Sequence, residues 1–282
     1  MLKLSVMSLS YQRAFREGRM DLWGYLDECR RLDMDAVDLH ARQLGSSDPE
    51  HLKEVKRRCL RLGFPIACLN VSNNFARPAA DMPAQVQLSK DGIDAAATLG
   101  APQVRLFAGV PAQDDDREAA WQRCVAALKE CADYGYAQGV HVCLQNHNHG
   151  AMTEYGHDVL SLVERAGPHL GHVWDTGQYV GSPGASGASD RRAQEVLYQS
   201  LQQTVHLATH VRCKIYRIAG GEEEWLDYPR IFGLLREVHY NGFCSIVYEP
   251  RDEQGRSEPR ADEVAGVEKA VPFLRRMMPL AR

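Results

Sequence analysis

Residues 140–150 read VHVCLQNHNHG, an apolar run that gives way to polar side chains at its end. Three later stretches repeat this plan: GHVWDTGQ at 171–178, HLATHVRCKIY at 206–216 and CSIVYEP at 244–250. Buried parallel strands are nearly continuous apolar runs, so polar residues gathered at one end of each run need a separate reason. In barrels of parallel strands, that reason is usually a site at the carboxyl ends of the strands.

Short β-like runs alternate with longer, charged amphipathic stretches along the whole chain. The expected strands are Leu2–Leu9, Ala36–His40, Pro65–Val71, Gln103–Val110, Val140–His147, Gly171–Thr176, His206–Ile218 and Phe243–Glu249. The expected helices are Asp21–Leu32, Pro49–Leu62, Met82–Leu99, Asp115–Gln138, Tyr155–Ala166, Asp190–Thr204, Tyr228–His239 and Ala261–Met277. Alternation implies a parallel sheet, and eight units favour closure. The sequence therefore predicts an α/β fold, a single (β/α)8 TIM barrel over residues 1–282.

A doubly wound open sheet is the alternative with the same alternation of elements. Its nucleotide-binding variant needs a GxGxxG turn after the first strand, and this chain has none there. We therefore expect no nucleotide cofactor. The length of 282 residues also suits a barrel, which typically needs about 250.

Composition sets further limits on function. Hydrophobic residues make up 44% and charged residues 25% of the chain, which is typical of a globular protein, and the net charge of −4 argues against nucleic acid as a partner. We expect no signal peptide and no membrane span, because the N-terminus lacks a long apolar run. The eight scattered cysteines contain no CxxC pair, which favours buried thiols and a cytoplasmic location. Homo-oligomerisation stays open.

One low-complexity stretch, GSPGASGAS at residues 181–189, follows the sixth expected strand. Two interpretations have equal weight. It is either a flexible connection between strand and helix or a lid over the site, because active-site loops in barrels come from these positions.

Polar residues share one face of several strands when each strand is divided with a period of two. They are Asp38 and His40 in the second strand, Asn70 in the third, Gln145 and His147 in the fifth, Asp175 in the sixth, His210, Arg212 and Lys214 in the seventh, and Glu249 in the eighth. Acids and bases from different strands would then converge in one ring. The alternative is a set of buried ion pairs, such as Arg212 with Glu249 or Lys214 with Asp175. The spacing of His147 and His149 is a weak metal-ligand signal.

These residues carry a resemblance to the sugar phosphate isomerase/epimerase family of the xylose isomerase-like TIM barrel superfamily. It spans nearly the whole chain and is strongest over Val140–Pro250. In that family strand five ends in Glu followed by Asn-His, strand six carries Asp-x-x-His, strand seven His-x-Lys, and strand eight ends in Glu. The resemblance implies that the first Glu, the Asp, the strand-seven His and the last Glu bind a divalent metal, and that the two Glu residues act as acid and base.

This sequence has polar residues at the same strand ends but differs at several of the metal-ligand positions. Asp175 and Glu249 match the Asp and the last Glu, whereas Gln145 replaces the first Glu, Gln178 the His of Asp-x-x-His, and Arg212 the strand-seven His. Gln145 cannot act as a base and Arg212 cannot bind a divalent ion. Either Gln145, Asp175 and Glu249 hold Mg2+ or Mn2+ weakly, or the guanidinium of Arg212 takes the place of the metal and stabilises a developing enediolate. We favour the second interpretation slightly.

We expect an isomerase or epimerase that removes a proton next to a carbonyl of a small sugar or keto-sugar. Glu249 is the expected base, His147 the second acid/base, and Arg212 and Lys214 the groups that polarise the carbonyl. The expected substrate-binding residues are Asp38, His40, Asn70, Gln145, Gln178 and His210. The alternatives are a lyase or dehydratase acting on an oxidised sugar and a non-catalytic sugar-binding barrel. An AP endonuclease on this fold is disfavoured, because it needs a zinc cluster and basic loops.

Overall fold

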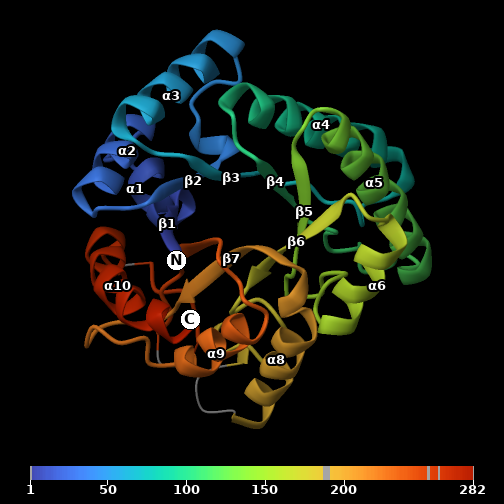
Figure 1. Cartoon of the computed structure of the whole chain (residues 1–282). Helices are drawn as coiled ribbons and strands as arrows, with labels where there is room; N and C mark the ends of the chain where they lie inside the picture. Colours follow the sequence, from blue (N-terminus) through green and yellow to red (C-terminus); the bar gives the residue numbers. More distant parts are fainter. Residues whose placement is uncertain (1, 187–190, 253–254, 260, 282) are drawn as a thin grey trace.

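A closed parallel barrel forms the centre of the molecule (Figure 1). The structure is a computed structural model that describes residues 2–186, 191–252, 255–259 and 261–281. Within these ranges, neighbouring strands follow chain order, and the last pairs with the first. The strands are β1 (Lys3–Met7), β2 (Ala36–His40), β3 (Ile66–Asn70), β4 (Gln103–Leu106), β5 (His141–Gln145), β6 (Leu170–Asp175), β7 (Ala208–Ile215) and β8 (Phe243–Tyr248). The predicted single (β/α)8 fold is confirmed.

Helices surround the barrel and cover the outer faces of the strands (Figure 1). The main helices are α2 (Leu22–Arg31), α3 (Pro49–Leu62), α4 (Met82–Leu99), α5 (Arg117–Ala137), α6 (Gly156–Ala166), α8 (Arg191–Thr204), α9 (Tyr228–Glu237) and α10 (Glu263–Met277). Two short helices, α1 (Gln12–Arg16) and α7 (Pro183–Ser186), were not predicted. None of the helices described here is long and apolar enough to cross a membrane.

Side-chain caps explain where several helices begin. Asp48 accepts hydrogen bonds from the amides of Glu50 and His51, and Pro49 opens α3 with a φ angle that suits the first turn. The same helix ends at Gly63, whose φ of +78° is left-handed and favours glycine. Aspartates likewise cap α2, α5, α9 and α10.

Most strands are shorter than the apolar pattern predicts, and β4 and β7 differ most from it. β4 ends at Leu106 because the amide of Phe107 donates to Asn73 Oδ1 at 2.8 Å and so leaves the sheet. β7 begins at Ala208 because residues 205–207 form a turn of 3-10 helix. The strand expectations of 103–110 and 206–218 were therefore too long.

The barrel interior is polar, whereas the apolar side chains lie between strands and helices. His210 on β7 contacts Asp38 on β2, and Arg212 on β7 contacts Gln145 on β5. These strands are not neighbours, so the contacts must cross the inside of the barrel. The alternate residues, such as Val211 and Trp174, belong to the large apolar core around the barrel. All eight cysteines are free and buried, as expected for small apolar side chains.

Candidate active site

A cavity of about 420 Å³ opens at the carboxyl ends of the strands. This volume lies in the range of about 300–1,000 Å³ that is common for small-molecule sites. Its lining includes Met7, Ser72, Arg105, Phe107, Gln145, His147, Gln178, Arg212, Lys214, Val247 and Glu249. Six sequence-predicted residues therefore meet in one place, and they lie on or just after β5, β6, β7 and β8: Gln145, His147, Gln178, Arg212, Lys214 and Glu249.

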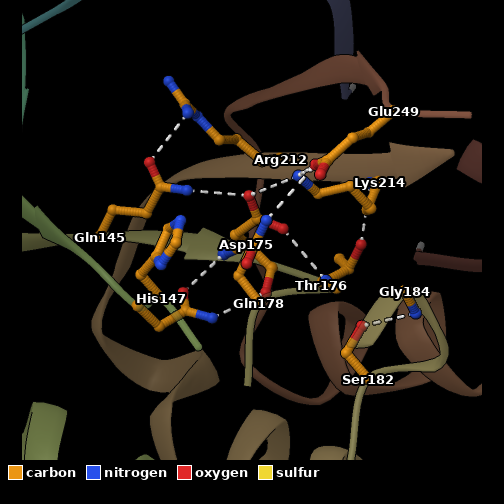
Figure 2. A network of polar contacts seen from close by, with 12 residues as sticks. Gln145, His147, Asp175, Thr176, Gln178, Ser182, Gly184, Arg212, Lys214 and Glu249 are labelled. Atoms are coloured by element: carbon orange, nitrogen blue, oxygen red, sulfur yellow. Dashed lines mark hydrogen bonds and ion pairs between the residues drawn. The ribbon is translucent and has the colours of Figure 1, made fainter. Parts of the chain in front are cut away.

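Asp175 lies behind the cavity wall at the end of β6 and is fully buried. Its Oδ2 accepts a hydrogen bond from Gln145 Nε2 at 2.9 Å and lies 3.6 Å from Lys214 Nζ, while its Oδ1 accepts from the amide of Gly177 at 3.0 Å (Figure 2). A side chain at Gly177 would collide with Lys214 Cγ at 2.6 Å. The turn after β6 therefore fixes both the aspartate and the lysine.

Arg212 spans the cavity floor, with 2% of its surface exposed. Its Nη1 donates to Gln145 Oε1 at 2.8 Å (Figure 2). Its Nη2 donates to Asn70 Oδ1, and its buried Nε has no partner. The expected alternative of an Arg212–Glu249 ion pair is wrong, because both hydrogen-bond acceptors of the guanidinium are neutral amides. The expected Lys214–Asp175 pair is present.

Glu249 and Lys214 form the charged pair at the cavity mouth. Lys214 Nζ lies 2.8 Å from Glu249 Oε2, and Arg251 contacts the other carboxylate oxygen. Burial raises the pKa of Glu249, but the two cations outweigh it and lower the pKa to about 2. The carboxylate is therefore ionised at neutral pH and is only weakly basic while both cations hold it.

His147 supplies a neutral imidazole to the same cavity. Its Nδ1 lies 2.7 Å from the carbonyl oxygen of Asn148, and a carbonyl can only accept, so Nδ1 carries the proton. Burial and the charge of Lys214 lower its pKa below 6.5, despite that hydrogen bond. The lone pair is then on Nε2, for which the described residues offer no hydrogen-bond partner. Phe107 packs edge-on against the ring, with centroids 5.2 Å apart.

Four residues predicted to bind substrate lie one layer below the cavity. Asp38 Oδ2 accepts from His210 Nε2 at 3.0 Å, and Asn70 donates to both Asp38 and the carbonyl of Leu39. His40 Nε2 lies 3.0 Å from Ser72 Oγ. None of the four lines the cavity. We correct their assignment: Asp38, Asn70 and His210 support Arg212 from below, and His40 supports Ser72.

Arg105 is a cavity residue that the sequence interpretation missed. It lies on β4 with 1% of its surface exposed, and its guanidinium stacks 3.9 Å from the centroid of Phe107. Its Nη1 donates to the carbonyl of Val71 at 2.7 Å, and its buried Nε has no partner. An arginine inside the short apolar run QVRL was the available signal, since a charge there needs a reason.

The sequence-predicted loop 181–189 is described only up to residue 186. Residues 181–184 are buried, and Ser182 Oγ lies 2.9 Å from Tyr216 Oη. This packing differs from the flexible connection that the composition indicated. Residues 187–189 lie outside the described residues, and the lid stays a prediction.

The fold family implies a divalent metal, and the oxygens that would bind it do not fit one here. Gln145 Oε1 faces the Arg212 guanidinium, Asp175 Oδ2 accepts from Gln145 Nε2, and Glu249 Oε2 faces Lys214 Nζ. Each candidate donor is thus turned to a proton of the protein itself. Among the described residues, no group of three or more His, Cys, Asp or Glu is placed to hold a metal ion, so His147 and His149 have no third ligand of these types beside them.

The comparisons with known proteins agree with this fold. Residues 26–277 match the family described as Xylose isomerase-like TIM barrel. The chain belongs to this family. The resemblance deduced from the strand ends is thereby confirmed. No curated protein matches the chain in sequence.

Several solved structures share the architecture at low sequence identity. An L-ribulose 3-epimerase has a TM-score of 0.74 at 15% identity, covering 100% of this chain and 96% of its own. The 3-keto-D-glucoside 4-epimerase of E. coli has a TM-score of 0.71 at 14% identity, with 98% and 99% covered. A xylose isomerase domain protein from Planctomyces limnophilus has a TM-score of 0.69 at 13% identity, with 98% and 95% covered. At these identities the likeness shows the fold alone.

Proposed function

We propose that this xylose isomerase-like barrel is an isomerase or epimerase that moves a proton next to the carbonyl of a small keto-sugar. One observation carries the proposal: a neutral imidazole, His147, and a carboxylate–ammonium pair, Glu249 and Lys214, face one sugar-sized cavity. Isomerisation and epimerisation both need a base, an acid and a cation that stabilises the intermediate oxyanion. The two named epimerases with this fold, which act on a ketose and a keto-glucoside, make this class of substrate the first to test.

Each of these residues has a role that follows from its state. His147 Nε2 holds a lone pair at neutral pH and can accept a proton from carbon. Lys214 can turn a proton of its ammonium to the substrate carbonyl. When it does, Glu249 loses a stabilising partner, so its pKa rises and it becomes a better base. Gln178 Oε1 is buried without a partner and can accept from a substrate hydroxyl.

Metal chemistry has no part in this proposal, because the oxygens that would bind the ion face protonated donors of the chain. Arg212 and Lys214 provide the positive charge instead. A guanidinium that is already fixed in place costs no reorganisation when negative charge develops.

Exchange of carbon-bound hydrogen tests the proposal directly. The protein is incubated in D2O with a set of ketoses and 3-keto-glycosides, and deuterium in the recovered sugar is measured by mass spectrometry and NMR. We expect exchange at the carbon next to the carbonyl. Glu249→Gln or His147→Gln should lower the rate by about a hundredfold or more, as expected for loss of a positioned acid or base.

Matched controls come from the exposed face of α6. His157→Gln and Glu164→Gln change the same residue types away from the cavity and should leave exchange unchanged. Tight sugar binding with no exchange would contradict the proposal and favour a non-catalytic binding barrel. Exchange accompanied by loss of a hydroxyl group would favour the lyase alternative.

A further inference from the structure

The side chains that line the cavity carry a net positive charge, whereas the chain as a whole carries a net negative charge. Five cationic side chains line it, against three carboxylates, although the whole chain carries a net charge of −4. The cations are Arg13, Arg16, Arg105, Arg212 and Lys214, and the carboxylates are Glu249, Glu258 and Glu263. A cavity lined by one sign of charge attracts ligands of the other sign.

Two of the three carboxylates that line the cavity are already engaged elsewhere, and the third, Glu258, is exposed. Glu249 holds Lys214 and Arg251, and Glu263 accepts the amides of Arg13 and Ala14 at 2.9 and 3.0 Å. The fully buried acids behind the wall are also paired, Asp38 with His210 and Asp175 with Lys214.

Arg105 and Arg212 are left without a negative partner. Their hydrogen bonds go to neutral oxygens only: the carbonyl of Val71 for Arg105, and the amides of Gln145 and Asn70 for Arg212. Neither forms an ion pair with a carboxylate of the described residues. Each also has a buried Nε without a hydrogen-bond partner, so neither guanidinium has its hydrogen bonds complete.

Two buried guanidiniums facing one cavity are costly without an anion. Burial and the charge of Arg212 both lower the pKa of Arg105, and they outweigh the more distant carboxylates of Asp38 and Asp175, which raise it. Buried charges are normally paired, and a carboxylate matches the planar fork of a guanidinium in a bidentate manner. The missing partner therefore has the chemistry of a substrate carboxylate.

We propose that the substrate is a sugar acid, whose carboxylate is held by Arg105 and Arg212 while its carbonyl end faces His147 and Lys214. This inference names the substrate class of the site and rests on the proposed function. A carboxylate suits the position better than a phosphate. Barrels commonly bind phosphate at the loops after strands seven and eight, whereas these arginines lie on β4 and β7 inside the barrel.

Equilibrium binding tests the substrate class without any turnover. Calorimetry with EDTA present compares an aldonate (gluconate), the matching neutral alditol (glucitol) and a phosphorylated sugar (glucose 6-phosphate). We expect the aldonate to bind at least about tenfold more tightly than the other two, the scale of a buried charge pair. Equal affinities, tighter binding of the alditol or the phosphate, or no aldonate binding at millimolar concentration would each overturn the proposal.

Variants then assign the affinity to the two arginines. Gln145→Glu keeps the shape of the side chain but sets a carboxylate against Arg212 Nη1, so it competes with the ligand carboxylate. It should weaken aldonate binding at least about tenfold more than it weakens alditol binding. Arg105→Gln should do the same. Arg123→Gln on α5, a half-buried arginine outside the cavity, is the matched control.

Folding and function are separated by design. Circular dichroism shows whether Arg105→Gln is folded, and Gln145→Glu carries the test if it is not. Full aldonate affinity in folded Gln145→Glu would refute the arginine pair as the carboxylate site. Binding needs no proton transfer, so selective aldonate binding would support the sugar-acid substrate even if no hydrogen exchange is found. Hydrogen exchange on neutral ketoses alone would refute the sugar-acid substrate and keep the proposed function.

Discussion

At the scale of single residues, the hydrogen-bond partner of a ring nitrogen decides what His147 can do. The carbonyl of Asn148 fixes the proton on Nδ1, and the cation of Lys214 disfavours a second proton on the ring. A histidine in this state is a base from near-neutral pH upward, whereas Glu249, with a pKa of about 2, is a weak base until its cations move. His147 and Glu249 thus differ in basicity, which suits a reaction in which one accepts a proton while the other donates one.

The titration of His147 is testable without a substrate. We expect its pKa to lie below 6.5 and Nδ1 to carry the proton of the neutral form, both read from NMR of the ring. Lys214→Gln should raise this pKa, because the repelling charge is gone, whereas Lys129→Gln on the exposed face of α5 should not change it. A pKa at or above 6.5 in the wild type would contradict the lowered pKa and the repulsion by Lys214.

At the scale of elements, the alternation of side chains along a strand predicts which residues face the barrel interior. It does not predict how far each of them lies below the cavity. It placed Gln145, Lys214 and Glu249 correctly at the cavity, yet Asp38 and His210 share the same inward face and lie below it. Depth depends on the stagger between strands, and the register shifts by a bulge at Val37/Asp38 in β2 and at His172/Val173 in β6. Such shifts leave no mark in the sequence of a single chain.

Strand four shows a different limit. The apolar run from Gln103 to Val110 predicts one long strand whose end carries no polar residue. The chain leaves the sheet at Phe107, so Arg105, which the pattern places in mid-strand, in fact lies at the strand end. The acceptor of the hydrogen bond that ends the strand, Asn73 Oδ1, lies in another loop, so the sequence pattern along one strand does not reveal it.

The connection between β7 and α9 depends on one buried acid. Glu223 accepts the amides of Tyr216 and Arg217 with one oxygen and that of Trp225 with the other. Burial outweighs these bonds and raises its pKa from 4.5 to about 7. The folded state binds the proton of the Glu223 carboxyl more tightly than the unfolded state does. This proton binding therefore stabilises the fold fully below pH 4.5, and the stabilisation is lost as the pH rises to about 7.

The stability of the protein should carry this signature. The free energy of unfolding is measured in urea for the wild type and for Glu223→Gln at pH 5 and at pH 8. Relative to the variant, the wild type should be about 2 kcal/mol more stable at pH 5 than it is at pH 8. Glu222→Gln, which changes an exposed neighbour paired with Arg276, should follow the wild-type pH dependence. Parallel curves for the wild type and Glu223→Gln would show that Glu223 does not titrate in this range.

At the scale of the whole molecule, closure of the barrel makes the site, because it brings β3, β5 and β7 together around Arg212. The sequence predicted this closure from the count of alternating elements. It also predicted the change in charge, since Gln145 and Arg212 stand where the resembling family has a carboxylate and an imidazole. The frame of the family is therefore kept while its centre has become cationic.

The change in charge should be reversible by restoring the family's ligand set. Protein purified without chelators should contain no stoichiometric metal, and calorimetry with Mn2+ or Mg2+ should show no binding at millimolar concentration, because Arg212 and Lys214 face the oxygens that would bind the ion. The double variant Gln145→Glu/Arg212→His removes one cation and adds two ligands beside Asp175 and Glu249, so it should bind Mn2+. Gln145→Glu alone should not, because its new carboxylate pairs with Arg212. If the wild type bound Mn2+ as tightly as the double variant, the guanidinium would not be what keeps the ion out, and the cationic site would lose its main support.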